Sequence, residues 1–407
     1  MPDIQVLVND FVSKLRKRKI EGSDATARLT AELLRSVISQ QPTTSGGAAL
    51  IEVVKSVGEQ LIAANPVELA VGNIVRQVLH IIRKEDFSLV TNAIGGLKLS
   101  AEANDEEIFE EENEQNLSTA AVDGRCLLRP PLLHALHGLL PYSATACQTS
   151  ALGDSSEGKA EKSARRWKLK HEVIKAVNEL IEDLNTCHEP IAEQAVELIH
   201  HNEVILTFGW SRFVLEFLKA AKEKKRSFHV FIAEGAPKYL GHVLAKELST
   251  KGLKTTVITD SAVFAMISRV NMVVLGVHAV MANGGVIAPV GSNMVALAAK
   301  KHAVPLVVVA GVHELCSLFP QNPEVSLNEI GSPSELLNFG EFSDCMDYGI
   351  GSGSPLLHVV NPVFDYVPPE LVSLFVTDAG AYNPSYIYQI IADYYSPDDL
   401  TPHKPVS

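Results

Sequence analysis

The 407-residue sequence is poor in cysteine and in positive charge. Its 5 cysteines are scattered and form no CxxC pair; they are Cys126, Cys147, Cys187, Cys316 and Cys345. This pattern fits a reducing compartment better than a disulfide framework. The formal net charge of -13 argues against a protein that coats a nucleic acid or an anionic membrane along its whole length.

A long uninterrupted apolar run is also missing. The longest apolar stretch, Met272 to Ala299, is broken by polar residues, glycines and Pro289, which predicts strand, turn and helix rather than a membrane span. Residues 1–9 show no basic patch followed by an apolar segment, so we expect no secretory signal. Together these features predict a cytosolic protein.

Helical periodicity is what the first part of the chain does contain. Apolar residues recur at helical spacing within residues 1–100, beginning with Val8, Phe11 and Leu15, and Ser23 or Asp24 fits the N-cap of a second helix. Helical patterns resume within residues 162–201, from Arg165 to Leu184 and again from Ile191 to Ile199. The two segments predict one N-terminal helical domain.

Residues 101–161, between these segments, lack any apolar period. They carry eight of the chain's 48 acidic residues in one run: Glu102, Asp105, Glu106, Glu107, Glu110, Glu111, Glu112 and Glu114. We expect a mostly disordered acidic insertion. A solvated linker is favoured over a docking segment for a basic partner, because blocks of like charge are usually disordered.

Residues 202–395 alternate short apolar runs with amphipathic segments. The runs have strand length and are rich in Val, Ile and Leu: 204–208, 228–233, 255–259, 272–276 and 305–310. Such runs indicate parallel strands covered on both faces. Right-handed crossovers then give a doubly wound, Rossmann-like α/β domain, followed by a tail over residues 396–407.

In such a fold ligands bind beyond the carboxyl ends of the strands. No GxGxxG or GxxxxGK[ST] motif stands there, so no nucleotide cofactor is expected. Gly209-Trp-Ser-Arg-Phe213 departs from a nucleophile elbow at its last position, and Ser211 fits a helix N-cap better than a nucleophile. Asp260 follows a strand and is expected to cap the next helix rather than to serve a ligand. No HExxH occurs, and the pairs His134/His137 and His200/His201 lack a third ligand at sensible spacing, so we predict no metal.

Lys14, Arg16, Lys17 and Arg18 belong to a run that we take as the one basic cluster of the sequence. A solvated helix face is the favoured interpretation. The alternative is contact with an acidic or phosphorylated partner, because Arg and Lys pair well with phosphate.

The strand-end segments carry a family resemblance. Ile205–Arg212, Glu234–Pro237, Thr259–Ser261 and Gly276–Val280 followed by Asn283–Val286 resemble the family that holds the regulatory subunits of eukaryotic translation initiation factor 2B and the related sugar-phosphate isomerases. The resemblance extends over the α/β domain and most of residues 1–100. It leaves out residues 101–161.

The isomerases of this family use a Cys, an Asp and a phosphate-facing Arg in these loops. The corresponding positions here are Gly209, His278 and Ala236, which offer no thiol, carboxylate or cation for that chemistry. The resemblance therefore implies a chain without catalytic residues. The expected vacated ligand pocket comprises Gly209, Trp210, Ser211, Arg212, Glu234, Gly235, Asp260, Ser261, His278, Asn283, Gly284 and Gly285.

Among the regulatory subunits, the beta branch is the most similar. Glu234–Pro237 and the segments Asn361–Glu370, Leu374–Val376 and Pro384–Tyr388 resemble its loop and C-terminal signature. This implies a regulatory subunit of the guanine-nucleotide exchange factor for initiation factor 2. Its implied partners are the alpha, gamma, delta and epsilon subunits, with delta as pseudo-twofold partner, and factor 2 with its phosphorylated alpha subunit. Direct nucleic-acid or membrane contact is not expected.

Three alternatives stay open. The delta branch shares the Pro-Pro-Glu portion of the tail. A sugar-phosphate isomerase-like enzyme would use the same fold. A small-molecule sensor would use the vacated pocket near Trp210, Glu234 and His278.

Overall fold

The computed structural model describes residues 4–20, 22–42, 46–101, 156–320, 328–338, 340 and 357–399. Most of the predicted acidic insertion lies outside these residues, together with Cys126, Cys147, Cys345 and residues 400–407. Two compact units are present. One combines Met1–Leu89 with Arg165–Ser407, and the other is Val90–Ala164.

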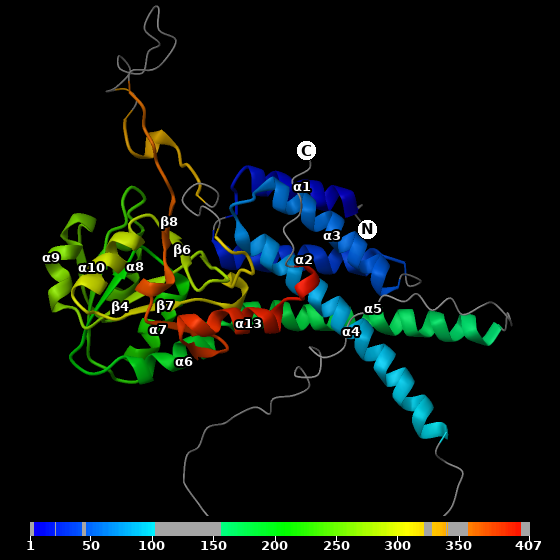
Figure 1. Ribbon diagram of the computed structural model, residues 1–407. Coiled ribbons are helices and arrows are strands. Elements are labelled where there is room, and N and C mark those ends of the chain that lie inside the picture. Colours follow the sequence, from blue (N-terminus) through cyan, green and yellow to red (C-terminus); the bar gives the residue numbers. More distant parts are fainter. Residues whose placement is uncertain are drawn as a thin grey trace, which may run out of the picture. The chain divides into compact units, whose positions relative to one another are not determined.

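The predicted N-terminal helices are confirmed in the described residues (Figure 1). They are α1 (Ile4–Arg16), α2 (Ser23–Gln40), α3 (Gly47–Ala64), α4 (Leu69–Ala101), α5 (Ser156–Thr186) and α6 (His188–Leu198). The apolar residues at helical spacing, such as Val8, Phe11 and Leu15, enter one buried cluster with residues of α2 to α5. Burial of this shared face, at about 25 cal/mol per Å² of apolar surface, is what holds the helices together.

Helix α5 begins earlier than the periodicity predicted. The expected start was Arg165, whereas the helix extends from Ser156 and so includes the last residues of the predicted insertion. Glu and Lys after Ser156 are good helix formers, although the same residue types also enrich disordered segments. The apolar pattern begins only at Leu169, the first buried residue described in this helix.

The α/β region is built on a seven-stranded sheet with the order β10-β9-β7-β4-β1-β2-β3. Its strands are β1 (Val204–Phe208), β2 (His229–Ala233), β3 (Lys254–Ile258), β4 (Met272–Gly276), β7 (Leu306–Val309), β9 (Leu374–Thr377) and β10 (Gly380–Tyr382). All neighbours pair in parallel except β10, which is antiparallel to β9. Strand β1 lies between β2 and β4, so the strand order reverses there, at the switch point of a doubly wound fold.

Helices cover both faces of this sheet. The core on one face joins Leu206 of β1 to α9 (Val263–Met266), α10 (Ser292–Lys301) and α13 (Ile387–Tyr394). The core on the other face joins Ile205 of β1 to α6, α7 (Arg212–Glu223) and α8 (Leu240–Thr250). Neighbouring strand residues point to opposite faces, so the near-continuous apolar strands are explained by burial on both sides. The predicted α/β class is confirmed.

The periodicity missed the last strands of the chain. Strands β9 and β10 extend the sheet, and a second, three-stranded sheet has the order β5-β6-β8, with β5 (Ala279–Val280), β6 (Val286–Pro289) and β8 (Phe364–Val367). These strands are short, and β8 contains the polar Asp365, so their sequence resembles a loop. They pair because β8 runs antiparallel to β6 over four residue pairs, from Val286↔Val367 to Pro289↔Phe364.

The C-terminal segment returns to the helical region. The hydroxyl of the buried Tyr395 donates a hydrogen bond to the carbonyl oxygen of Leu315 at 2.5 Å. Asp399 is almost fully buried; it pairs with Arg83 of α4, and Lys55 of α3 lies 3.8 Å away. The described part of the predicted tail is therefore anchored by a charge pair that spacing alone does not reveal.

Candidate functional site

The loops after β1, β2 and β3 meet at the carboxyl edge of the sheet. Gly209 has φ 64° and Gly235 has φ 69°, left-handed values that favour glycine. A Cβ on Gly235 would lie 3.3 Å from the Cα of Gly209, so the two loops touch. Asp260 joins them from the third loop, because its carboxylate oxygens accept hydrogen bonds from the backbone N–H groups of Gly235 at 2.9 Å and Ala236 at 2.8 Å.

The expectation that Asp260 caps a helix is wrong. The N-cap of the short helix Asp260–Ala262 is Thr259, without a side-chain capping bond, and the Asp260 carboxylate turns back to the Gly235 loop. Two free N–H groups in a left-handed turn attract an anion more strongly than the end of one helical turn does. Ser261 meets only a local partner among the hydrogen bonds of the described residues, with its hydroxyl 3.2 Å from that of Thr259.

Ser211 occupies the predicted N-cap of α7, although its hydroxyl makes no capping bond. It packs against the end of β4, where a Cβ on Gly276 would lie 2.3 Å from the Ser211 Cβ. Trp210 is partly exposed beside it, at 39%. Glu234 is partly buried, and its Oε2 lies 3.5 Å from Nε2 of His242. No described contact gives Ser211 a base that would make it a nucleophile.

His278 has a packing role in this structure. Its ring stacks on Phe364 of β8 with the centroids 4.5 Å apart, and its Nε2 lies 3.2 Å from the carbonyl oxygen of Val67. Glu68 Oε1 is 3.8 Å from the same nitrogen. The side chain therefore connects the turn before α4 to the small sheet. His278, which stands where the isomerases have a catalytic Asp, is therefore held by structural contacts.

Asn283, Gly284 and Gly285 form the turn between β5 and β6. The Asn283 amide donates to the hydroxyl of Tyr366 at 2.8 Å and accepts from the Gly285 N–H at 3.0 Å, while Gly284 has φ 79°. These contacts hold the turn on β8. Gly235 thus contacts both Gly209 and Asp260, whereas His278 and Asn283 have other partners.

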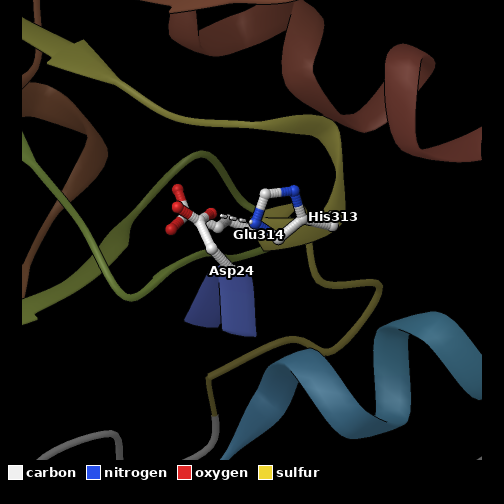
Figure 2. A group of neighbouring side chains, drawn as sticks. All are labelled: Asp24, His313 and Glu314. Atoms are coloured by element: carbon white, nitrogen blue, oxygen red, sulfur yellow. Dashed lines mark ion pairs between the residues drawn. The ribbon is translucent and has the colours of Figure 1, made fainter. Parts of the chain in front are cut away.

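A buried polar cluster follows β7, in the short helical turn Val312–Glu314 (Figure 2). Nε2 of His313 lies 2.9 Å from Oδ1 of Asp24, in the first turn of α2. Glu314 Oε1 accepts a hydrogen bond from the Ser23 hydroxyl at 2.6 Å, and its Oε2 accepts one from the Gly311 N–H at 3.3 Å. We call Ser23, Asp24, His313 and Glu314 the buried ion cluster.

The charges of the buried ion cluster shift one another's protonation. Burial alone would lower the pKa of His313, but hydrogen bonds with Asp24 and Cys187 outweigh it and hold that pKa well above its ordinary value. Burial raises the pKa of Glu314 to about 8. At neutral pH the protonated imidazole is therefore balanced by Asp24, while Glu314 holds a proton.

Further hydrogen bonds fasten this cluster to three more elements. Asn73 of α4 donates from its amide to the carbonyl oxygen of His313 at 3.0 Å, and Asp378, between β9 and β10, accepts from the Val312 N–H at 2.8 Å. Arg212, a predicted pocket residue, lies 3.9 Å from Oδ2 of Asp24 and 3.4 Å from Nδ1 of His188. The cluster therefore links the helical region to the carboxyl edge of the sheet.

Asp24, His313 and Glu314 have the chemistry of metal ligands, with ligand atoms within 4.8 Å of one another. Each group already has a partner within the protein, and the Arg212 guanidinium near Asp24 opposes a divalent cation. A charge-balanced cluster of protein groups accounts for the geometry. The prediction that the chain binds no metal stays a prediction.

The sequence offered only partial signals for this cluster. Ser23 or Asp24 was expected to be the N-cap of α2, a position that Gly22 takes instead, and neither Asp24 nor His313 was predicted as part of a site. Their meeting depends on how α2 packs beside β7, which no local spacing encodes. The one sequence feature that could have indicated this cluster is the adjacent pair His313 and Glu314, shortly after a buried strand.

The predicted basic run at the end of α1 is partly neutralised. Lys14 pairs with Asp10 at 2.8 Å, and Arg18 pairs with Glu329. Arg16 and Lys17 are exposed. The favoured interpretation as a solvated helix face fits these contacts, whereas a partner contact of the run stays a prediction.

The model of the initiation factor 2 subunit family matches residues 19–384. The chain belongs to this family. The translation initiation factor eIF2B subunit beta of Dictyostelium discoideum is 39% identical over 393 residues, which cover 96% of this chain and 95% of that relative. The beta subunit of Schizosaccharomyces pombe is 34% identical over 396 residues, with 96% of each chain covered. The predicted resemblance to the beta branch is confirmed.

The family also contains an enzyme. The ribose 1,5-bisphosphate isomerase of Archaeoglobus fulgidus is 30% identical over 226 residues, which cover 54% of this chain and 67% of that relative. Family membership alone therefore does not decide between catalytic and non-catalytic roles. The residues in the loops at the carboxyl edge of the sheet bear on that question.

Solved structures have the same fold. Crystal structures of eIF2B beta from Chaetomium thermophilum and of the tetrameric eIF2B-beta2-delta2 complex from that organism match with TM-scores of 0.66 and 0.63 at 24% and 22% identity. The first match covers 98% of this chain and 94% of that chain, and the second covers 97% and 96%. Among the described residues, no helix has the length and apolar character that a membrane crossing requires.

Proposed function

We propose that this chain is a non-catalytic regulatory beta subunit of the guanine-nucleotide exchange complex for translation initiation factor 2. The observation that carries the proposal is the match to two beta subunits along 96% of the chain. In this proposal nucleotide exchange is catalysed by another subunit. This chain contributes to sensing the phosphorylated alpha subunit of factor 2 through a difference in affinity between two binding poses.

The carboxyl edge of the sheet supports a non-catalytic role, because the chain's own carboxylates fill its anion-binding positions. Asp260 accepts from the N–H groups of the Gly235 loop, as described above. Asp365 Oδ2 accepts from the N–H groups of Gly291 at 2.7 Å and Asn293 at 3.2 Å, at the start of α10. A helix N-terminus and a left-handed turn are where a sugar phosphate would bind. With internal carboxylates in place, a phosphate meets like charge there.

Exposed apolar side chains on the α/β region support a subunit contact. They lie on α8, β3, α9 and α10, and comprise Tyr239, Leu240, Val243, Val257, Phe264, Met294 and Leu297. Exposed apolar groups of this kind favour surfaces that partners cover, here around the β3 edge of the sheet, between α8 on one face and α9 and α10 on the other. The proposed partner for this surface is delta, as in the beta2-delta2 tetramer of Chaetomium thermophilum. The alpha, gamma and epsilon subunits complete the proposed complex in the cytosol, and helices of the N-terminal region, with Arg16 and Lys17 exposed, face factor 2.

Affinity purification of the tagged chain from its own cells tests this proposal. We expect stoichiometric recovery of four other exchange-factor subunits, together with factor 2 at low salt. A GDP-release assay on the recovered complex, with and without phosphorylated factor 2, checks regulation. Recovery as a homodimer without the other subunits would refute the proposal.

A second candidate, an aldose–ketose isomerase acting on phosphosugars, is favoured only by the likeness to the Archaeoglobus fulgidus enzyme. Turnover of ribose 1,5-bisphosphate by the purified chain would establish isomerase activity and refute the proposed non-catalytic role. Calorimetry with sugar phosphates and nucleotides tests the third candidate, a small-molecule sensor. We expect no heat of binding, because Asp260 occupies the amides that a phosphate would use.

The predicted domain boundaries enter as a proposal as well. We propose a helical domain of residues 1–100 and 162–201 and an α/β domain of residues 202–395, with an acidic insertion between the helical segments. Limited proteolysis followed by mass spectrometry tests these limits. Cuts concentrated within residues 101–161 are expected.

A further inference from the structure

A second basic cluster lies on α5. The sequence from residue 165 to 171 reads Arg-Arg-Trp-Lys-Leu-Lys-His and contains no acidic residue. The expectation of a single basic cluster at Lys14–Lys19 is therefore wrong. We call Arg165, Arg166, Trp167, Lys168 and His171 the Trp167 surface. It differs from the α1 run because an aromatic side chain stands among the cations.

Within the described residues, the Trp167 side chain shows no packing contact with the helical core, and its one ring contact is with His171 on the same helix. All residues from 163 to 168 are exposed, and the contact of α5 with the helical core begins at Leu169. Trp167 is 59% exposed, more than Trp210 at 39%, the other tryptophan of the chain. Tryptophan is on average a well-buried residue, so an exposed indole ring among cations suggests a surface that binds something.

Helix geometry presents this ring as a flat platform. Trp167 and His171 are one turn apart, and their rings stack with centroids 5.7 Å apart and an interplanar angle of 3°. The stacking restricts the rotamers of the indole ring, which lowers the entropy lost when a second planar group binds on it.

Three cations that neighbour Trp167 in the sequence are available to a ligand. In the described part of the chain, no ion pair involves Arg165, Arg166 or Lys168, whereas Lys14 and Arg18 of the α1 run are both paired. Lys170 is used internally. Its ammonium group donates to the carbonyl oxygens of Ser39 at 2.7 Å and Gln41 at 2.6 Å, which fastens α5 to the end of α2.

We propose that the Trp167 surface binds single-stranded RNA. A base stacks on the indole ring, and the neighbouring phosphates pair with Arg165, Arg166 and Lys168. This combination of an aromatic platform and cations is how single strands are bound without sequence preference. An acidic peptide would use the cations but has no planar group for the ring. The expectation of no direct nucleic-acid contact rested on the net charge of the whole chain, which this local surface does not share.

The two tryptophans allow a direct test on the full-length chain. In a Trp210→Phe variant, Trp167 is the only tryptophan. Titration with a uridine oligonucleotide of about ten residues, within the range of single-strand site sizes, should quench its fluorescence saturably. The affinity should fall with salt with a logarithmic slope of about -2, as three phosphate contacts predict.

Variants separate stacking from charge. Trp167→Ala should weaken the binding of fluorescein-labelled RNA about tenfold, and Trp167→Phe should weaken it less, since base stacking is lost only in the first. Arg165→Gln, Arg166→Gln and Lys168→Gln together should abolish the salt dependence. A control variant with Lys222→Gln, Lys224→Gln and Lys301→Gln removes three exposed cations elsewhere and should keep the parent affinity.

Three results would overturn the proposal. One is a titration without saturable quenching at about 50 mM salt, where phosphate contacts are strong. Another is equal loss of binding in the control variant, which would indicate unspecific charge. The last is tight binding of oligoglutamate that is unaffected by Trp167→Ala, which would assign the surface to an acidic protein partner. Circular dichroism of every variant excludes unfolding as the cause.

Discussion

Asp24 in the first turn of α2 and His313 directly after β7 form an ion pair with 2.9 Å between Oδ1 and Nε2. The imidazole is buried and the carboxylate is partly exposed. Removing one partner of such a pair leaves the other charge desolvated without compensation. The two residues thus couple the stability of the helical region to that of the sheet.

Asp24→Asn should lower the free energy of unfolding by about 3 kcal/mol, the low end of the range for breaking a buried pair. Urea denaturation followed by circular dichroism measures this. Asp10→Asn is the matched control, since Asp10 pairs with Lys14 on the surface, where ion pairs contribute little. Equal effects of the two variants would contradict the role of the buried pair.

The unfolding free energy should fall as pH rises from about 5 to about 8. Glu314 has an ordinary pKa of 4.5 that burial raises to about 8, so the folded chain keeps a proton that the unfolded chain releases over this window. The raised pKa of His313 acts in the same direction above pH 6.5, and the buried Asp378 does so at lower pH. Each group contributes at most about 1.4 kcal/mol per pH unit.

Glu314→Gln removes one of the groups that bind a proton more tightly in the folded chain than in the unfolded chain. The variant should show a shallower decline of stability with pH and should exceed the parent at pH 8, because its neutral amide needs no proton. Denaturation midpoints at half-unit pH steps check this. An unchanged slope would mean that Glu314 is ionised in the folded chain.

Asp260→Ala should turn the Gly235 loop into an anion site. Two backbone N–H groups lose their acceptor, at a cost of about 1–3 kcal/mol in stability. Sulfate or phosphate should then raise the melting temperature of the variant more than that of the parent, because an anion that binds only the folded state stabilises it. The same response in Asp365→Ala would show that its carboxylate fills an anion-binding position at the start of α10. No response in either variant would contradict the view that internal carboxylates fill anion-binding positions.

Gly209→Ala and Gly276→Ala should destabilise the chain for different reasons. Gly209 has φ 64° with open space around a Cβ, so its cost is conformational, about 1–2 kcal/mol. A Cβ on Gly276 would lie 2.3 Å from the Cβ of Ser211, so its cost is steric. Ser211→Gly should rescue Gly276→Ala and leave Gly209→Ala unaffected. A double-mutant cycle measures this coupling.

Leu297→Glu on α10 should weaken the proposed contact with delta and leave the fold intact, since Leu297 is exposed. Recovery of delta in co-purification should drop at least tenfold. Val6→Glu on α1, also exposed, is the control. Undiminished recovery with Leu297→Glu would place the contact on another face.

Periodicity predicted the elements that local physics dictates. Five strand runs and the N-terminal helices are found where Val, Ile and Leu recur at the right spacing, because burial on one or two faces fixes that spacing. Strands β8 to β10 escaped prediction, since Asp365 and Tyr366 resemble loop residues until β6 supplies a partner. The roles of Asp24 with His313, and of Asp260 with Gly235, depend on residues distant in sequence, which no single-sequence pattern carries.

Among the described strands, β3 stands at one edge of the seven-stranded sheet, pairs with β2 alone, and exposes Val257. An uncovered edge with apolar neighbours is a template for other chains. A copy made in excess of its partners therefore becomes a substrate for aggregation or for quality-control proteolysis. In the proposed complex, synthesis of this chain is therefore expected to be matched to that of the subunit that covers the edge of β3.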